Sequence, residues 1–328
     1  MQLIEPKFEI WEQGTSLEAM WEHIARCTRV CYQSQSNVKE GETAEQFVKR
    51  VILRETSNRD LDFTKLHLAM LEHGTIYLEY TVKDPTKYAQ LADYHNAEDT
   101  IHNLIKKYDY NPYSKIFVNQ YVDYVAITTN LRVIIENNWY EDLQYVCTPT
   151  SFHYKRVTVS FTTNIGVTRE FNRHRVNSIA EESTRYCNYN KRNDGEINIG
   201  LPAWIKDEDC PQEYIRDLNN MSIAEYCTDF VDNDTDPSDI WDEWCYYFFA
   251  LKACEFAYNG LIAKGWKPQQ AREVLPLATK SQLIHTAFVD DWKHFFALRA
   301  EGVSGPPHPN ARLLAKPLYE EFKKRNLL

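Results

Sequence analysis

Apolar residues in this chain recur with two periods, and each period predicts a kind of secondary structure. Apolar positions three and four apart predict helices over 17–24, behind the capping residue Ser16, and over 44–52. Alternation of apolar and polar residues predicts half-buried strands over 76–82 and 155–163. The pattern therefore combines helices and strands in one chain.

Capping residues set the expected ends of several helices. Thr43 and Gln46 have the spacing of a capping box, and Gly74 stands where the helical segment 67–73 is expected to stop. Another helix is expected over 129–136, because its apolar residues form one side. A short helix from about residue 166 is expected to lead into the most polar part of the chain.

The second half of the chain contains a helix that is apolar on nearly all sides. Asp236 is an N-cap candidate, Pro237 suits the first helical position, and the pattern continues to about Lys264. Because little polar face remains, we expect this helix in the core or at a subunit interface. A shorter helix is expected to open at Pro268 and to end before Pro276.

Residues 84–126 have no clean period. They carry Pro85, the pair Asn111-Pro112 and many tyrosine and aspartate residues, so we expect an irregular or partly helical insertion. No internal repeat, linker or low-complexity tract interrupts the rest of the pattern. We therefore expect one domain over residues 1–328 that contains this insertion.

Composition narrows the class of protein. The chain has 328 residues, of which 43% are hydrophobic, and a net charge of −10, which argues against nonspecific binding to nucleic acid. No apolar run approaches the roughly eighteen residues of a membrane helix, and the first residues are too polar for a signal peptide. The eight cysteines form no CxxC pair. We expect a soluble cytoplasmic protein with reduced thiols and no membrane partner.

The segment from Arg173 to Tyr186 concentrates polar chemistry. It holds three guanidinium groups, an imidazole and two carboxylates within fourteen residues. Arg173 and Arg175 repel each other unless an oxygen-rich anion lies between them, and arginine binds phosphate through two donors at once. The segment therefore predicts an anion site for a small ligand. The alternative is a surface helix with Arg–Glu pairs, which are common and individually weak.

Other chemistries have weaker support. Cys187 follows the segment, and nearby arginines would activate a thiol, but nothing supplies a base, so a small buried residue is the stronger interpretation. His67, His73 and His174 do not have metal-ligand spacing, so no metal is expected. The chain has only ten glycines and no GxGxxG, which leaves a Rossmann phosphate loop unsupported.

Arg173-His174-Arg175, followed after seven residues by Ser183, resembles the signature of the flavin-dependent thymidylate synthases. Thr184, Arg185 and Tyr186 continue the match. Further blocks agree in order and spacing: Arg29–Tyr32, His67–His73, Ala271–Pro276, and Trp292–Phe295 with Arg299. These blocks span most of the chain.

The resemblance implies an α/β (α+β) fold in which helices pack on a mainly antiparallel sheet, and a homotetramer whose active sites form between subunits. It implies binding of FAD, dUMP, methylene-tetrahydrofolate and NADPH. In this family the folate carbon is transferred to C5 of dUMP, and reduced flavin supplies the hydride that completes the methyl group. No enzyme cysteine attacks the pyrimidine, in agreement with the weak case for Cys187.

The resemblance also assigns residues. FAD contacts are expected from His67, Ala69, Arg173, His174, Arg175, Glu181, Phe288, Asp290 and His294. Contacts with dUMP are expected from Glu170, Arg173, Glu181, Glu182, Ser183, Thr184, Arg185, Arg272 and Arg299. Arg299 is the expected catalytic residue, because a cation beside the uracil ring favours loss of the N3 proton. The segment 173–175 is thus expected to face the flavin, and 181–185 the nucleotide.

Several positions depart from the family pattern. Glu170 stands where some members have glutamine, and a carboxylate would repel a phosphate. Cys31 and Ala69 replace hydroxylated residues, and Phe288, Asp290 and His294 replace an Asn-x-Arg-x-x-x-Asn pattern. These departures leave open a noncatalytic nucleotide-binding homologue as the alternative.

Some residues also have structural interpretations. Arg272 has the alternative of a plain ion pair with Glu273. His73 is expected to be structural, whereas His67 could be either structural or part of the site. The aromatic residues Trp292, Phe295 and Phe296 recur at helical spacing and are expected in the core.

Overall fold

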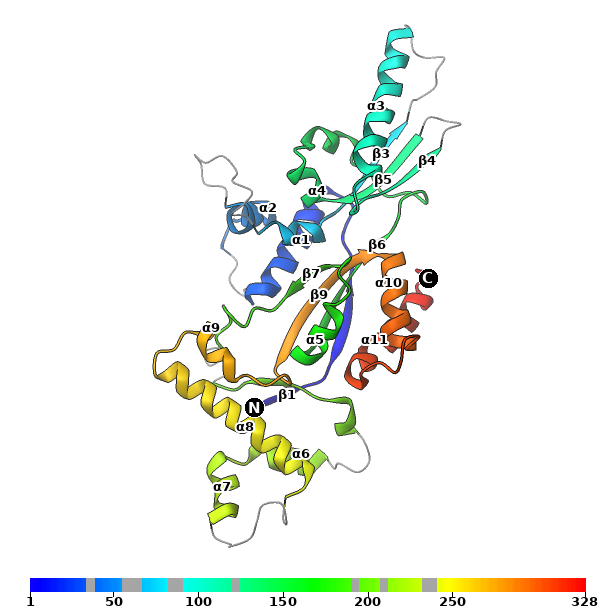
Figure 1. Cartoon of the computed structure of the whole chain (residues 1–328). Helices are drawn as coiled ribbons and strands as arrows, with labels where there is room; N and C mark the ends of the chain where they lie inside the picture. The colour runs from blue at the N-terminus through cyan, green and yellow to red at the C-terminus, as the bar shows by residue number, and fades with distance from the viewer. Residues whose placement is uncertain are drawn as a thin grey trace.

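A four-stranded antiparallel sheet forms the centre of the molecule, as the computed structural model in Figure 1 shows. In spatial order its strands are β2 (Lys7–Trp11), β6 (Arg156–Asn164), β9 (Lys280–Phe288) and β7 (Ser178–Glu181). The structure describes residues 1–33, 39–54, 67–81, 91–119, 124–189, 195–206, 212–231 and 241–328. The expected mixed fold with a mainly antiparallel sheet is confirmed.

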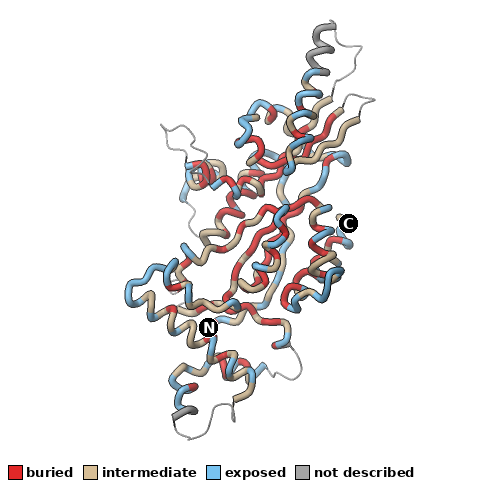
Figure 2. Tube along the Cα trace, in the orientation of Figure 1, coloured by how far each residue is buried: buried red, intermediate tan, exposed pale blue. Residues whose placement is uncertain are grey.

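One face of the central sheet is covered by a large apolar cluster, and the other combines buried polar groups with a smaller apolar cluster. Val159 and Phe161 of β6 pack into a buried cluster with Trp292, Phe295 and Phe296, which confirms the expected core role of these aromatic residues. Helices cover this face: α5 (Ile165–Phe171), α10 (Val289–Phe296) and α11 (Pro309–Lys324). Figure 2 shows the buried residues concentrated along the central strands.

Buried polar groups bond to one another on the opposite face. Thr158 of β6 lies 2.7 Å from Thr286 of β9 between their hydroxyl oxygens. His23 contacts Thr158 at 3.0 Å, and His73 contacts Thr286 at 2.8 Å. Burial lowers the pKa of His23 to about 4 and that of His73 well below its usual value. His73 is therefore part of a buried network, as the structural interpretation expected.

A second sheet lies above the first in Figure 1. Its antiparallel strands, in spatial order, are β3 (Thr75–Thr81), β5 (Tyr124–Asn130) and β4 (Lys115–Asn119). Helix α3 (Leu91–Asp109) precedes β4. Within the described part of the segment 84–126, helix α3 confirms the expected partly helical character, whereas β4 and the start of β5 are strands that the sequence did not predict. Alternation is missing in β5 because six of its seven residues are buried, so neither face of the strand is exposed to solvent.

Helix α1 (Leu17–Tyr32) joins the two sheets, because it packs against β3 on one side and against β7 and β9 on the other. The Ser16 side chain accepts a hydrogen bond from Ala19 N, which confirms the expected cap. The capping box of Thr43 and Gln46 is also present. The remaining elements here are α2 (Ala44–Val48), a π-helical turn Lys49–Leu53, 3-10 helices Leu68–His73 and Tyr140–Tyr145, and α4 (Leu131–Glu136).

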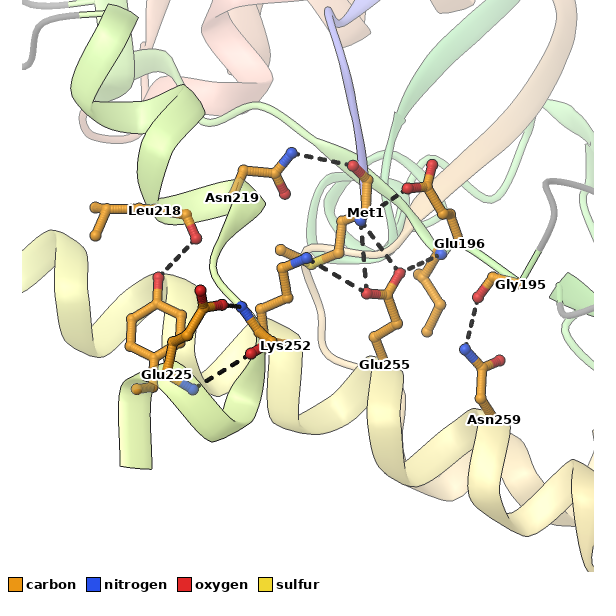
Figure 3. A network of polar contacts seen from close by, with 12 residues as sticks. Met1, Gly195, Glu196, Leu218, Asn219, Glu225, Lys252, Glu255 and Asn259 are labelled. Carbon is orange, nitrogen blue, oxygen red and sulfur yellow. Dashed lines mark hydrogen bonds and ion pairs between the residues drawn. The ribbon is translucent and has the colours of Figure 1, made fainter. Parts of the chain in front are cut away.

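Further helices pack below the central sheet. This part contains the parallel strands β1 (Gln2–Ile4) and β8 (Asn198–Gly200), a 3-10 helix Ala203–Lys206, and helices α6 (Gln212–Asn220), α7 (Ile223–Val231), α8 (Glu243–Ala263) and α9 (Pro268–Ala271). Figure 3 shows contacts of Glu255, a residue of α8, that link this helix to the segments next to β1 and β8. Its carboxylate accepts from Ile197 N at 2.8 Å and lies 3.4 Å from the Met1 ammonium.

Helix α8 begins later than expected. Asp242 is its N-cap and accepts from Cys245 N at 2.8 Å, whereas the expected cap Asp236 and Pro237 lie outside the described residues. Trp241 and Asp242 precede the helix, so a helix that runs unbroken from residue 237 is wrong. Phe248 and Leu251 face the core, while Phe256 is 70% exposed. None of the described helices combines the length and apolar character of a membrane span.

Candidate functional site

A cavity of about 640 Å³ lies where the end of α5 meets the residues that follow α10. Its lining residues are Glu170, Arg173, His174, His294, Leu298, Arg299, Ser304, Gly305, Pro306, Pro307 and His308. We call it the Arg299 cavity. Arg299 comes from a π-helical turn, Ala297–Glu301, that continues α10 and ends at Gly302. Gly302 has φ 75°, and a side chain there would meet Gly305 O and Pro307, so this turn requires glycine.

Contacts from two sides fix the Arg299 guanidinium. Its Nη1 donates to Glu170 Oε2 at 2.6 Å, and its Nη2 donates to the backbone oxygen of the same residue at 2.7 Å. Its Nε donates to His174 Nε2 at 3.2 Å. The Arg299 side chain is 13% exposed, so water screens these contacts only in part. The side chain is thus held at the cavity wall, and N–H groups remain that these three contacts do not use.

His174 must be neutral in this arrangement. A guanidinium only donates, so His174 Nε2 has to accept with its lone pair, which places the ring proton on Nδ1. Burial, and after it the charges of Arg299, His294 and Arg173, together lower the pKa of His174 to about 4. The ring of His294 lies 5.7 Å from that of His174. The cavity therefore presents cations and a neutral imidazole.

A second cavity, of about 560 Å³, lies on another side of α5. Its lining residues are Ile165, Thr168, Arg169, Glu181, Glu182, Ser183, Thr184, Arg185, Arg272, Glu273, Leu275, Pro276 and Leu277. We call it the Arg272 cavity. Strand β7 ends at Glu181, and the turn that follows supplies 182–185. The segment that starts at Arg173 therefore borders both cavities, with 173–174 at one and 181–185 at the other.

Arg272 contacts the turn directly. Its Nη1 donates to Thr184 Oγ1 at 3.3 Å, and its Nε lies 3.9 Å from a Glu273 carboxylate oxygen. The alternative ion pair with Glu273 is therefore present, and Arg272 also lies beside Thr184, another residue expected to contact dUMP. Arg185 is exposed and lies over the ring of Tyr186, 5.3 Å from its centroid. Two guanidinium groups thus flank the turn.

Neighbouring side chains hold both carboxylates of the segment. Glu181 accepts from Asn172 Nδ2 at 2.9 Å and from Ser281 Oγ at 3.1 Å. Glu182 accepts from Lys280 Nζ at 2.7 Å. The sequence did not point to Asn172, Ser281 or Lys280. The last two lie at the start of β9, a strand that the alternation did not predict, because its middle residues are buried on both faces.

The other expected FAD residues are dispersed. His67 and Ala69 are exposed near the start of a 3-10 helix, where His67 Nε2 lies 3.2 Å from Arg54 Nη2. Phe288 is buried, with the Lys115 ammonium 4.9 Å from its ring centre. Asp290 accepts from Lys115 at 2.8 Å and from Lys293 at 2.9 Å. Neither Phe288 nor Asp290 lines the Arg299 cavity or the Arg272 cavity.

Guanidinium and imidazole groups meet at the Arg299 cavity. Arg173, His174 and His294 line it, and the exposed Arg175 directly follows His174 in the chain. Such groups are of the kind that binds phosphate. Phe288 is buried and Asp290 is paired with Lys115, and neither lines this cavity. The described residues contain no group of three or more side chains that could hold a metal ion.

Cys187 is fully buried next to the Arg272 cavity. It belongs to an apolar cluster with Tyr189, Ile197 and Tyr258, and its backbone N–H donates to Ser183 O at 3.0 Å. A nucleophile has to reach its substrate, and this thiol has no exposed surface. The location therefore favours the interpretation as a small buried residue.

A family model described as "thymidylate synthase complementing protein" matches residues 147–326, just over half of the chain. The chain belongs to this family. The match includes both cavities and the segment between them. Strands β3, β4 and β5, with helices α1 and α3, lie outside it. The family assignment therefore concerns the part of the molecule that holds the candidate site.

The other comparisons add no further argument about the candidate site of this member of the thymidylate synthase complementing family. Among solved structures, the chain is similar to a UMP/dUMP methylase, PolB from Streptomyces cacaoi, bound with 5-Br dUMP. The identity is 14% and the TM-score 0.40, over 99% of this chain and 93% of that chain. A likeness this loose carries no weight for the site. No curated protein matches the chain.

Proposed function

We propose that the protein is a flavin-dependent thymidylate synthase that converts dUMP to dTMP. Methylene-tetrahydrofolate would be the carbon donor, and NADPH would reduce the bound FAD. The observation that carries the proposal is the segment 173–185, which borders a cationic cavity at one end and an arginine-flanked turn at the other. Family membership supports the reaction class.

The Arg272 cavity is the proposed nucleotide site. Ser183, Thr184 and Arg185 would bind the phosphate of dUMP, because the turn offers hydroxyl groups and a guanidinium beside Arg272. Glu181 and Glu182 border the same site. Arg173, Arg175, His174 and His294 would hold FAD at the Arg299 cavity. Bound reduced flavin supplies the hydride that completes the methyl group.

Arg299 is the proposed catalytic residue. A fixed cation beside the uracil ring stabilises the negative charge that develops when the N3 proton is lost, and its position costs no reorganisation during the reaction. Each unit of pKa shift at N3 corresponds to about 1.4 kcal/mol. Glu170 acts here as the partner that orients Arg299.

Nucleotide and flavin have to meet, yet Arg299 and Arg272 line different cavities of one chain. We therefore propose that each active site forms between subunits, so that the Arg299 cavity of one chain faces the Arg272 cavity of another. A homotetramer would provide this arrangement. In this proposal residues 1–328 form one domain, and the segment 84–126 is an insertion within it.

A visible spectrum of the purified protein tests the proposal. We expect flavin absorbance on isolation or after addition of FAD, and release of tritium from C5-labelled dUMP when methylene-tetrahydrofolate and NADPH are present. Tritium is the right label because the C5 hydrogen leaves as the methyl group forms. Protein that neither binds FAD nor releases tritium would refute the enzyme.

The alternative is a noncatalytic nucleotide-binding homologue. The positions of Phe288 and Asp290 favour it, because neither suits a flavin contact, and Ala69 has no hydroxyl group to donate. Binding of dUMP without flavin absorbance and without tritium release would support this alternative over the enzyme.

A further inference from the structure

A buried ion pair lies beneath the turn that lines the Arg272 cavity. Lys280 Nζ donates to Glu182 Oε2 at 2.7 Å, and the two side chains are 15% and 4% exposed. For comparison, the surface pair of Lys316 and Glu320 has a similar distance, 2.9 Å, but its side chains are 47% and 53% exposed. A charge removed from water in this way has to be compensated, so the Lys280–Glu182 pair is sensitive to loss of either partner.

Backbone contacts make Glu182 the anchor of the turn. Its N–H donates to Gln282 O at 2.8 Å, and its carboxylate accepts from Gln282 N at 3.2 Å. The next residue, Ser183, donates its N–H to Cys31 O at the end of α1. The turn thus starts from a point that is fixed to β9 on one side and to α1 on the other.

The charge of the pair matters as much as its geometry. The Arg272 cavity is lined by three glutamates, Glu181, Glu182 and Glu273. Glu181 is held by neutral groups, and Glu273 is exposed to water, whereas Glu182 is compensated by Lys280. Without the ammonium, a buried carboxylate would repel an anion bound to the turn, and little water would screen it.

We propose that Lys280 is a positioning residue of the nucleotide site. It fixes the turn 183–185 through Glu182 and neutralises the Glu182 carboxylate, which makes the Arg272 cavity acceptable to a nucleoside monophosphate. This inference rests on the proposed function. Lys280 does not line the cavity itself, so it acts through Glu182 rather than by contact with the ligand.

The test measures binding of dUMP and of 2′-deoxyuridine, which lacks the phosphate, by titration calorimetry. Lys280→Met keeps the length of the side chain and removes its charge. We expect its Kd for dUMP to rise by about tenfold or more, equivalent to about 1.4 kcal/mol, and its Kd for deoxyuridine to change much less. At saturating dUMP, turnover should stay within about threefold of wild type, because the lost interaction concerns binding.

A double variant separates charge from fold. Lys280→Met with Glu182→Gln removes both charges and keeps both shapes, so we expect dUMP affinity to recover most of the loss. Lys280→Arg keeps the charge and should bind better than Lys280→Met. Lys316→Met, which breaks the exposed pair, is the control and should bind dUMP like wild type. Thermal melts of every variant report folding, and if Lys280→Met does not fold, the double variant and Lys280→Arg still test the charge.

Two results would overturn the inference. One is Lys280→Met with wild-type affinity for dUMP; the other is an equal loss for dUMP and deoxyuridine without recovery in the double variant. In both cases wild-type binding of dUMP leaves the proposed function intact. Wild-type protein that binds no dUMP would instead refute the proposed function, and the role of Lys280 with it.

Discussion

The Arg299 cavity and the Arg272 cavity differ in which charged side chain is held in place by a partner of opposite charge. In the first, an arginine is held by a carboxylate, with side chains 13% and 34% exposed. In the second, a carboxylate is held by a lysine, and the carboxylate is only 4% exposed. In the Arg299 cavity the held group is the Arg299 guanidinium, which lies at the wall and keeps N–H donors for a ligand. In the Arg272 cavity the held group is the Glu182 carboxylate, which anchors the turn that carries the proposed ligand contacts.

This difference indicates which charged side chains remain available to contact a ligand. Glu170 and Glu182 were both expected to contact dUMP, yet each carboxylate is already bound to a cation of the same chain. Arg299, in contrast, is oriented by its partners and keeps N–H groups that these contacts do not use. The cations thus carry the proposed ligand contacts, and the carboxylates position the structure around them.

The largest effect is expected for Arg299→Lys. A compact ammonium cannot contact Glu170 and His174 and also present a planar face to the uracil ring. We expect turnover in the tritium-release assay to fall by about 10²–10³-fold, with a much smaller change in dUMP affinity. Arg325→Lys is the matched control, because Arg325 forms an ion pair with Glu321 outside both cavities. Unchanged turnover in Arg299→Lys would remove Arg299 from the mechanism.

Glu170→Gln should have a smaller and opposite effect. The amide oxygen can still accept from Arg299, and the backbone contact remains, so the guanidinium stays in place while a negative charge is removed. We expect dUMP to bind roughly threefold more tightly, because the pair is partly exposed and its charge is partly screened. Titration calorimetry measures this change. Weaker binding would return Glu170 to the set of direct substrate contacts.

The pKa of His174 offers a test without turnover. It lies at about 4 because of burial and the neighbouring cations, of which Arg299 is the largest contributor. Arg299→Leu removes that charge, so the pKa should rise toward 6.5, its ordinary value. The proton chemical shift of the His174 ring, followed by NMR over pH, reports the change. Arg272→Leu should leave this pKa unaltered, and an equal rise in both variants would mean that the cavities are not electrostatically separate.

The smallest effect is expected for Cys187→Ala. The thiol is buried beside the second cavity, so the change should cost about 1 kcal/mol of stability and leave turnover within a few-fold of wild type. Tritium release and a thermal melt measure the two quantities. A variant that folds but has no turnover would support the hypothesis that Cys187 is a catalytic nucleophile.

Local signals predicted much of the fold. Ser16 and the box of Thr43 and Gln46 cap their helices as expected, because such bonds span only three residues. The same logic failed for α8, where several acidic residues compete and only the folded chain selects Asp242. Strands β5 and β9 were missed because burial on both faces removes the alternation that identifies a strand.

The sequence by itself determined the chemistry of the segment 173–185, because its residue types and their spacing are local. Its division into two ends is visible as two cavities. Only the tertiary structure decided which of these side chains is held and by what. Glu182 meets Lys280 across 98 residues of chain, and Arg299 meets Glu170 across 129. Strand pairing and helix packing bring these partners together in space. No local sequence pattern indicates a contact between residues so far apart in the chain.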